Sequence, residues 1–235
     1  MKKIGIIGAM EVEIDTLRAA MSLASTKEIS GMTFYEGTLD GVQIVLVRSG
    51  IGKVFASMAA EIMAVLYEVD ALINTGVGGG IAEGLSIGEV VLATKLVQHD
   101  MDTSPLGDPV GLISGINVIY LPCDEALTKE LFLAMDTLGY PHRRGIIASG
   151  DQFICDREKK DRIVSLFDAS VCEMEGAAIA QVAYVNRIPC AVLRAISDNG
   201  NEEASVDYPT FVAEAAEKSA NVLRAFLQKQ AAKNN

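Results

Sequence analysis

Apolar runs of strand length alternate with stretches of helical periodicity along most of this chain. Residues 4–8 form a short run of apolar and small side chains, which predicts a buried strand. In residues 11–21 the apolar side chains recur at the spacing of one helical face, so we expect a helix with Glu13 in its first turn. Strands that alternate with helices favour a sheet with parallel strands, covered by helices.

The same pattern predicts the remaining elements. Further strands, rich in β-branched and apolar residues, are expected at 34–39, 42–48, 71–75, 89–97, 116–121, 145–149, 171–175 and 190–196. Further helices are expected at 54–67, 124–138 and 177–185, and a last helix is expected to open at Pro209 and to leave a frayed tail at 231–235. Asp40 and Gly41 are typical of a tight hairpin, so part of the sheet should be antiparallel. We therefore predict the α/β fold class, as a single domain over residues 1–230 with a central mixed β-sheet flanked by helices.

Two segments interrupt the alternation. The glycine-rich residues 76–80 follow a predicted strand and are expected to break it. Residues 99–115 contain two prolines and three glycines without clear periodicity. Because long irregular loops inside compact domains are often functional, we expect this segment to be mobile or to contact a partner.

Composition and charge narrow the functional classes. Half of the 235 residues are apolar, so one sizeable hydrophobic core can form. The formal net charge of −11, from 20 basic and 31 acidic residues, argues against nucleic acid and anionic membrane surfaces as partners. The first apolar run holds only seven residues and no later segment could span a bilayer, so we expect a cytoplasmic protein.

Neither metal nor nucleotide cofactors are indicated. The chain has only two histidines, and its four cysteines show no CxxC spacing, which favours reduced, buried thiols at Cys123, Cys155, Cys172 and Cys190. Residues 76–80 lack the third glycine of a dinucleotide motif, and residues 50–53 are followed by valine where a Walker A loop has its Mg²⁺-binding hydroxyl. Acid–base chemistry would therefore fall to carboxylates.

Three carboxylates each follow a β-type run, where ligands of open α/β sheets collect; they are Glu13, Glu175 and Asp198. Structural alternatives stay open for two of them, because Glu13 could complement a helix dipole and Asp198 could cap a turn with Asn199. Glu175 and Asp198 have no adjacent Lys or Arg in the sequence, so a structural role would need a partner from elsewhere. Arg194 could be the partner of any of the three.

Six short motifs follow one another along the chain. They are Gly5-Ile6-Ile7-Gly8-Ala9-Met10-Glu11-Val12-Glu13, Ser49-Gly50-Ile51-Gly52-Lys53, Asn74-Thr75-Gly76, Ser149-Gly150-Asp151-Gln152-Phe153, Glu173-Met174-Glu175 and Arg194-Ala195-Ile196-Ser197-Asp198. In this order they closely resemble the bacterial 5′-methylthioadenosine/S-adenosylhomocysteine nucleosidases of the nucleoside phosphorylase superfamily. The resemblance runs from residue 4 to about residue 228. It implies hydrolysis of the N-glycosidic bond of these two nucleosides, which releases adenine and the thioribose product for methionine salvage.

The resemblance implies the catalytic roles. Adenine leaves poorly as an anion, so a general acid protonates its N7; Asp198 matches that acid, and Ser197 helps to hold it. Glu13 matches the base that activates the attacking water, and Arg194 is similar to the family arginine near that water. Glu175 matches the carboxylate that binds the ribose hydroxyls and stabilises the oxocarbenium-like ribose.

The resemblance also implies substrate contacts. Phe153 matches the ring that stacks on adenine, Ile154 supplies main-chain contacts to the base, and Met174 packs beneath the sugar. Core packing is the alternative for Phe153 and Met174. Ile51 belongs to the same expected substrate site, and so does Val77, which stands where many members have a serine and so removes a hydroxyl near the ribose and the water.

A homodimer is implied by the same resemblance. Thr103 and Leu106 match the segment that covers the 5′ pocket of the partner subunit, and Leu106 stands where an aromatic residue is common. Selectivity for the 5′ substituent is therefore open. The resemblance implies no cofactor and no metal.

Three other functions stay open. A purine nucleoside phosphorylase shares the fold, but it would have to bind phosphate where this chain places Glu11, Glu13 and Val77. A 6-amino-6-deoxyfutalosine hydrolase acts on the same adenine and ribose with a different 5′ group, so the sequence does not exclude it. A non-catalytic nucleoside-binding protein would not require both a water-activating base and an acid for the purine.

Overall fold

The computed structural model describes residues 3–201 and 203–234. Residues 1, 2 and 202 and the last residue of the expected tail lie outside this description. The strands are β1 (Lys3–Gly8), β2 (Ser22–Ile29), β3 (Met32–Leu39), β4 (Val42–Arg48), β5 (Ala71–Asn74), β6 (Val77–Gly80), β7 (Val90–Gln98), β8 (Tyr120–Pro122), β9 (His142–Ser149), β10 (Ala169–Glu173) and β11 (Cys190–Asp198). The helices are α1 (Glu11–Ala20), α2 (Lys53–Val65), the 3₁₀ turn η1 (Ser104–Leu106), α3 (Glu125–Leu138), α4 (Arg157–Phe167), α5 (Gly176–Asn186) and α6 (Ala204–Asn234).

The described strands form one mixed sheet in the order β2-β3-β4-β1-β5-β11-β6-β10-β9-β7-β8. Strands β4, β1, β5 and β11 run parallel to one another, and β3 and β4 form the hairpin predicted from its Asp-Gly turn. Strand β11 pairs with β5 along its first residues, with β7 in its middle and with β6 at its end. This half of the sheet therefore closes on itself and carries the ends of β10 and β11 to one place.

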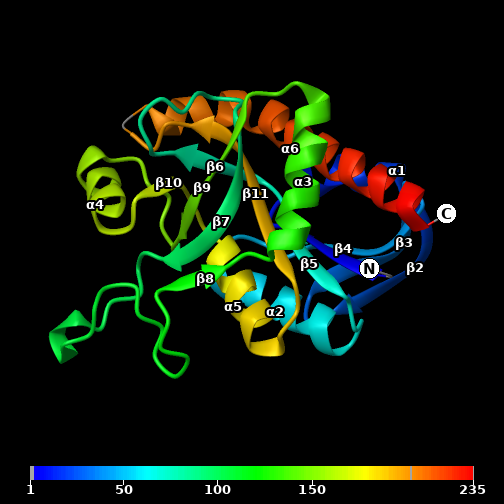
Figure 1. Ribbon diagram of the computed structural model, residues 1–235, viewed down its shortest axis with the longest axis horizontal. Coiled ribbons are helices and arrows are strands. Elements are labelled where there is room, and N and C mark those ends of the chain that lie inside the picture. The colour runs from blue at the N-terminus through cyan, green and yellow to red at the C-terminus, as the bar shows by residue number, and fades with distance from the viewer. Residues whose placement is uncertain (1–2, 202, 235) are drawn as a thin grey trace.

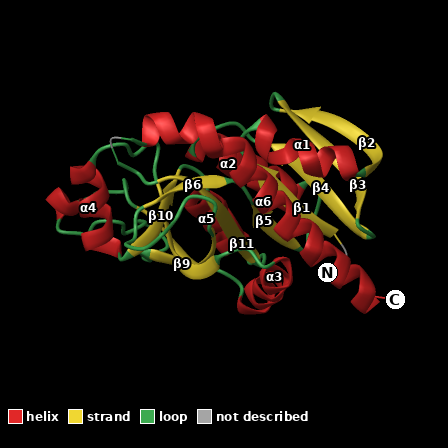
Figure 2. Ribbon diagram, turned by 90° about the horizontal axis from the view of Figure 1, so that it is seen from above, coloured by secondary structure: helices red, strands yellow, loops and turns green. Residues whose placement is uncertain are grey.

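Helices cover the sheet on both sides (Figure 1, and from above in Figure 2). Helix α6 packs on β11 and on helices α1 and α3, and their apolar side chains form one core cluster. Helices α2 and α5 pack against each other and contribute to a second cluster. The predicted single α/β domain with a mixed sheet flanked by helices is confirmed. No described helix combines the length and the apolar character needed to cross a membrane.

The glycine run after β5 interrupts that strand, which ends at Asn74, but it also forms a strand of its own that the sequence did not indicate. Val77–Gly80 forms β6, between β11 and β10. This additional strand was missed because its glycines serve close packing between strands. A methyl group on Gly78 would lie 2.7 Å from Val171 Cγ1, and one on Gly79 would lie 2.9 Å from Asp198 Oδ1.

Two elements were not predicted from the sequence because they bury few side chains. Strand β2 is an edge strand whose residues are nearly all exposed, so it lacks the apolar alternation of a half-buried strand. Helix α4 buries only Ile163 and Phe167 beneath a strongly charged surface. Of the strand expected at 116–121, only Tyr120–Pro122 is extended, because the residues before it turn back to form an isolated bridge between Ile113 and Val118.

The last helix differs from its prediction at both ends. It begins at Ala204, a buried residue whose N–H bonds to the carbonyl of Asn201, so Pro209 lies inside the helix and does not open it. The segment expected to fray is helical through Asn234, and Lys233 forms an ion pair with Glu130 at 2.5 Å. Ala231 also packs against the core.

Candidate active site

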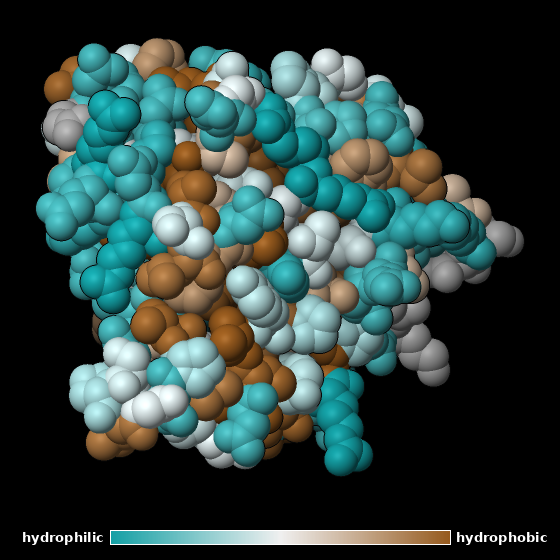
Figure 3. Space-filling model, turned by 60° about the vertical axis from the view of Figure 1, so that its left-hand side comes forward, coloured by the Kyte–Doolittle hydropathy of each residue, from teal (hydrophilic) through white to brown (hydrophobic). Residues whose placement is uncertain are grey.

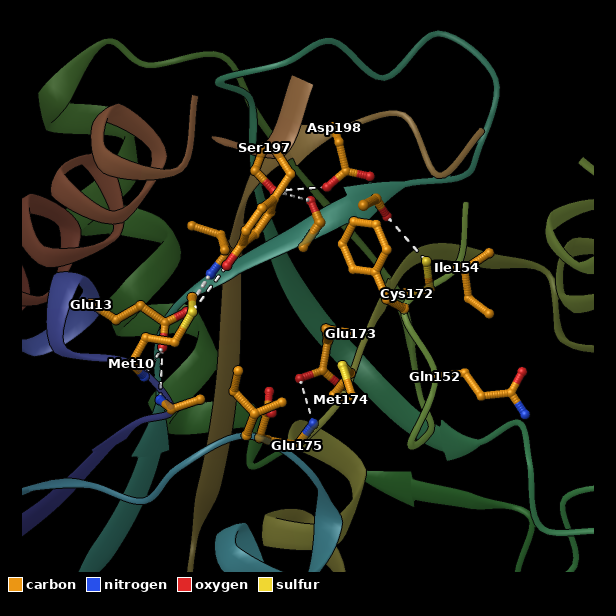
Figure 4. Close-up of a pocket in the computed structure, with 17 residues that line it drawn as sticks. Met10, Glu13, Gln152, Ile154, Cys172, Glu173, Met174, Glu175, Ser197 and Asp198 are labelled. Carbon is orange, nitrogen blue, oxygen red and sulfur yellow. Dashed lines mark hydrogen bonds between the residues drawn. The ribbon is translucent and has the colours of Figure 1, made fainter. Parts of the chain in front are cut away.

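A cavity of about 360 Å³ lies beside the carboxyl ends of β1, β10 and β11. Figure 4 shows Glu13, Glu175 and Asp198 on different sides of this cavity. Its wall consists of Ala9, Met10, Glu13, Ile51, Val77, Gly78, Gly79, Gln152, Phe153, Ile154, Cys172, Glu173, Met174, Glu175, Ser197, Asp198 and Tyr208. The three carboxylates singled out in the sequence therefore surround one space large enough for a small molecule.

Glu13 enters the cavity from the first turn of α1. Its side chain is buried, and its Oε2 accepts hydrogen bonds from the backbone N–H groups of Ala9 at 2.7 Å and Met10 at 3.0 Å. Its Oε1 accepts a third bond from the N–H of Val77 at 3.1 Å. Burial raises the pKa of Glu13 above its ordinary value, while the positive charge of Arg194 and the three backbone bonds oppose that rise. The carboxylate is thus held in one orientation by β1, α1 and β6 together.

Asp198 closes the opposite side at the end of β11. Its side chain is buried; the Ser197 hydroxyl donates to Oδ2 and the Gly200 N–H donates to Oδ1, both at 2.9 Å. Burial raises the pKa of Asp198, although both hydrogen bonds act against the rise. A carboxyl with a raised pKa retains its proton to higher pH than an exposed aspartate, as a general acid requires.

Glu175 stands at the start of α5, where β10 ends two residues earlier than predicted. Its Oε1 accepts a hydrogen bond from the N–H of Gly52 at 2.8 Å, and its Oε2 lies 3.9 Å from the guanidinium of Arg194. Burial, together with the negative charge of Glu173, raises the pKa of Glu175 to about 8, although Arg194 opposes the rise. Gly52 adopts φ of +98°, a backbone conformation that favours glycine at the position that donates this bond.

Arg194 lies behind the cavity wall and is fully buried. Its Nη2 forms an ion pair with Glu173 and a hydrogen bond to Asn74 Oδ1, while its Nη1 donates to the carbonyl of Leu193 at 2.9 Å. Its Nε has no hydrogen-bond partner among the described residues. The sequence left Glu13, Glu175 and Asp198 open as ionic partners of Arg194. Glu175 is the nearest of these three, but the residue that pairs directly with Arg194 is Glu173.

The other predicted site residues divide into two groups. Phe153, Ile154, Met174, Ile51 and Val77 all line the cavity, and Ser197 does so beside Asp198. Ile154 is buried, whereas Phe153 and Ile51 are exposed at its mouth.

Thr103 and Leu106 form the second group and do not reach this cavity. They lie in the projecting loop that carries η1, where the Thr103 hydroxyl donates to Asp108 at 2.8 Å and Leu106 is 83% exposed. Neither residue lines the cavity of its own chain.

Several wall residues were not predicted as site residues. Tyr208 is the clearest: its ring meets Phe153 edge to face at 5.6 Å, and its hydroxyl lies 3.0 Å from the sulfur of Met10. Gln152 and Cys172 also line the cavity. Tyr208 directly precedes the proline at which the last helix was expected to open, so no periodic pattern marked it.

The cavity wall is acidic. It contains four carboxylates and, among the described residues, no Lys, Arg or His side chain. No described group of three or more His, Cys, Asp or Glu side chains has an arrangement that could hold a metal ion. Cys172 is buried in the wall, and burial raises the pKa of its thiol above the ordinary range, which makes it a poor nucleophile. Cys123 and Cys190 are also buried and free, whereas Cys155 is free but exposed.

Comparison with known proteins places the chain among purine-nucleoside enzymes. Residues 3–228 match the family model of the phosphorylase superfamily. The chain is 38% identical to the 5′-methylthioadenosine/S-adenosylhomocysteine nucleosidase of Shewanella loihica, over 96% of this chain and 99% of the relative. It is 39% identical to the aminodeoxyfutalosine nucleosidase of Campylobacter jejuni, over 97% of this chain and all of the relative.

Solved structures agree with this placement. The structure of the 5′-methylthioadenosine/S-adenosylhomocysteine nucleosidase of Neisseria meningitidis, in complex with methylthio-immucillin-A, matches with a TM-score of 0.94 and 34% identity. The match covers 97% of this chain and all of that chain. The chain therefore belongs to the phosphorylase superfamily and, within it, to the family of the 5′-methylthioadenosine/S-adenosylhomocysteine nucleosidases.

Proposed function

We propose that this protein hydrolyses the N-glycosidic bond of 5′-methylthioadenosine and S-adenosylhomocysteine, releasing adenine and the thioribose product. The observation that carries the proposal is the convergence of Glu13, Glu175 and Asp198 on one cavity, from α1, from the start of α5 and from the end of β11. Such an enzyme needs an acid for the base, an anion for the sugar and a base for water.

Asp198 acts as the acid for the purine. Its raised pKa keeps the proton available, and Ser197 and Gly200 orient the carboxyl group through the two bonds described above. Protonation of N7 makes adenine a neutral leaving group as the C1′–N9 bond lengthens. Proton donation of this kind contributes about 10²–10⁴ in rate.

Glu175 and Glu13 act on the sugar and the water. Glu175 binds the ribose hydroxyls, and its negative charge stabilises the positive charge that develops on the ribose in the transition state. Glu13, fixed by three backbone bonds, takes the proton from the attacking water. Arg194 supports both carboxylates electrostatically, since its charge lowers the pKa of each.

The remaining wall residues bind the substrate. Phe153 stacks on the adenine ring, the main chain of Ile154 contacts the base, and Met174 packs beneath the ribose. Ile51 and Val77 complete the substrate site. Val77 contributes its N–H to Glu13, so this contact survives without a serine hydroxyl at that position.

The acidic wall favours water over phosphate as the nucleophile. A phosphate dianion next to Glu13 and Glu175 would be repelled, and the described wall offers no cation to bind it. Arg194 is buried behind the wall and already paired with Glu173. The products are therefore adenine and a free sugar, with or without phosphate in solution.

A homodimer completes the site in this proposal. Helices α2 and α5 lie side by side and, together with Ile51 just before α2, expose apolar side chains that a partner subunit would cover; on the helices these are Val54, Phe55, Tyr184 and Val185. Apolar side chains also gather across the face of the molecule shown in Figure 3. The loop that carries η1 projects from the fold at the lower left of Figure 1, and in this proposal its exposed Leu106, together with Thr103, reaches the 5′ pocket of the second copy. We place this dimer in the cytoplasm, in methionine salvage, without a cofactor.

A second candidate substrate is 6-amino-6-deoxyfutalosine. It is favoured by the full-length match to the aminodeoxyfutalosine nucleosidase of Campylobacter jejuni, at 39% identity. Its adenine and ribose make the same demands on Asp198, Glu175 and Glu13, so only the 5′ pocket would separate it from the first two substrates. A comparison of kcat/KM for the three nucleosides would identify the preferred substrate.

The test is adenine release by the purified protein from 5′-methylthioadenosine, with the sugar product identified by mass spectrometry. We expect free methylthioribose, and an Asp198→Asn variant that loses far more activity on adenine nucleosides than on a riboside with an activated leaving group. A ribose 1-phosphate product would indicate a phosphorylase. The absence of adenine release at saturating substrate would favour a nucleoside-binding protein.

A further inference from the structure

Glu173 is a buried carboxylate of the cavity wall to which the proposed mechanism gives no task. Its Oε2 accepts hydrogen bonds from the N–H groups of Glu175 at 3.1 Å and Gly176 at 2.8 Å. The Ser149 hydroxyl donates to its Oε1, and Arg194 Nη2 forms the ion pair with its Oε2. Four donor groups thus converge on a side chain that is 2% exposed, which fills the capacity of a carboxylate.

These donors belong to three elements that hold the sugar side of the cavity. The two backbone N–H groups begin α5 and fix the position of Glu175, Ser149 ends β9, and Arg194 lies in β11. Ser149 also accepts a hydrogen bond from the N–H of Ala177, the second residue of α5, at 2.7 Å. Glu173 therefore joins α5, β9 and β11 directly behind Glu175.

Arg194 shares its charge unequally between the two neighbouring glutamates. Its Nη2 is bonded to Glu173 but lies 3.9 Å from Glu175 Oε2, which is beyond hydrogen-bond distance. The same Nη2 donates to Asn74, whose amide in turn donates to the carbonyl of Ile7 at 2.9 Å. The guanidinium is thus held away from Glu175 on both sides.

We propose that Glu173 is a positioning residue for this site, which engages Arg194 and so leaves the carboxylate of Glu175 free to bind the ribose hydroxyls. The inference rests on the proposed nucleosidase function. Without Glu173, the buried guanidinium would lose its direct ionic partner and would turn to the remaining carboxylate nearby, Glu175. The ribose hydroxyls would then have to compete with a guanidinium for the same carboxylate oxygens.

This role has a signature in the pH profile. The negative charge of Glu173 raises the pKa of Glu175, whereas Arg194 lowers it. Removing the first charge and releasing the second both lower that pKa. The titratable groups that face Glu175 from the surrounding elements are Glu173 of β10, Arg194 of β11, Glu13 of α1 and Tyr208 of α6.

The experiment compares wild type, Glu173→Gln and Glu173→Asp, with kcat/KM for adenine release from 5′-methylthioadenosine measured between pH 5 and pH 9.5. We expect Glu173→Gln to move the acid limb of the profile down by about one pH unit, the smaller end of the effect of a nearby charge. We also expect its plateau to fall about tenfold or more, mainly through KM. An acid limb that stays in place or moves up in Glu173→Gln would overturn the proposal.

Glu173→Asp and one further variant, Ser149→Ala, separate charge from structure. Glu173→Asp keeps the charge but shortens the reach, so we expect a lower plateau with the acid limb in its wild-type position. A shift of that limb would overturn the proposal even if Glu173→Gln did not fold. Ser149→Ala removes a hydrogen bond to Glu173 without changing a charge, and should lower the Tm while the limb stays in place. A wild-type protein that releases no adenine would refute the nucleosidase proposal itself, which distinguishes the two failures.

Discussion

A methyl group on Gly76 should inactivate the site without unfolding the protein. Gly76 lies between β5 and β6, directly against the carboxylate of Glu13. A Cβ there would overlap Glu13 Oε1 and lie 2.8 Å from its Cδ. The backbone carbonyl of Gly76 already accepts bonds from the Ala195 N–H at 3.0 Å and from the Ser219 hydroxyl at 2.8 Å, so the main chain cannot easily move away.

The carboxylate of Glu13 must therefore move, and the structure gives the size of that movement. Two carbon atoms in contact are about 3.5–4.0 Å apart, so the side chain has to retreat by about 1 Å. Its bonds to the N–H groups of Ala9, Met10 and Val77 measure 2.7, 3.0 and 3.1 Å, and a shift of that size breaks at least one of them. A base misplaced by about 1 Å costs about 10²-fold in rate.

The assay is kcat/KM for adenine release from 5′-methylthioadenosine by Gly76→Ala, with the Tm measured in parallel. We expect a loss of about 100-fold in kcat/KM. Gly31→Ala is the matched control, because Gly31 has φ of +75° and no atom near an added Cβ, so it should lower the Tm while activity stays. The shorter side chain of Glu13→Asp leaves room for the methyl group. The double variant Gly76→Ala/Glu13→Asp should therefore lose less activation free energy in kcat/KM than the two single variants lose together. Full additivity, or activity of Gly76→Ala within about threefold of wild type, would refute the reasoning.

Four further outcomes follow from the geometry. Glu175 has a pKa of about 8 when folded against 4.5 for an exposed glutamate, so its protonation stabilises the fold; the Tm of the free protein should fall between pH 5 and pH 9, and Glu175→Gln should flatten that slope. An unchanged slope would contradict the assignment. Lys160→Met removes the hydrogen bond from Nζ to the Asn199 carbonyl at 2.9 Å and a positive charge that lowers the pKa of Asp198. The alkaline limb of the pH profile of kcat/KM should therefore move to higher pH, and a limb that stays in place would count against Asp198 as the acid. Val77→Thr restores a hydroxyl at nearly constant shape and should raise kcat/KM about fivefold, the value of one hydrogen bond; a decrease would mean that the side chain does not face the water. Leu106→Asp should raise KM for 5′-methylthioadenosine and weaken dimers in sedimentation, and normal values for both would remove this loop from the partner's site.

Burial explains which parts of the fold could be predicted from the sequence. Strands β1, β5 and β11 are buried on both faces and appear as continuous apolar runs. Strand β2 bears the polar side chains of an exposed edge, and β6 consists largely of glycines whose contacts come from β10 and β11. No pattern within either segment could show these contacts, because they depend on strands far away in the chain.

The same distinction applies to the site. Glu13, Glu175 and Asp198 could be selected because each carboxylate follows a β-type run, and the structure gathers them around one cavity. Tyr208 joins them only because the start of α6 crosses the cavity, a tertiary feature that leaves no periodic signal. Thr103 and Leu106 came from resemblance alone, and their proposed task needs a second copy of the chain.

The buried guanidinium of Arg194 acts unequally on the carboxylates of the site. Four of them line the cavity, and each would be costly to ionise without compensation, because burial disfavours charge. The charge of Arg194 lowers the pKa of Glu13 and of Glu175, the two groups that must be negative to accept a proton from water and to stabilise the ribose. At Asp198 the groups that favour ionisation are a backbone N–H and a hydroxyl, and Lys160 adds only a minor charge. Arg194, placed in β11 behind the sugar, thus acts on the two carboxylates of the water and the ribose, whereas the groups that lower the pKa of Asp198, on the side where the purine leaves, are hydrogen-bond donors and a lysine.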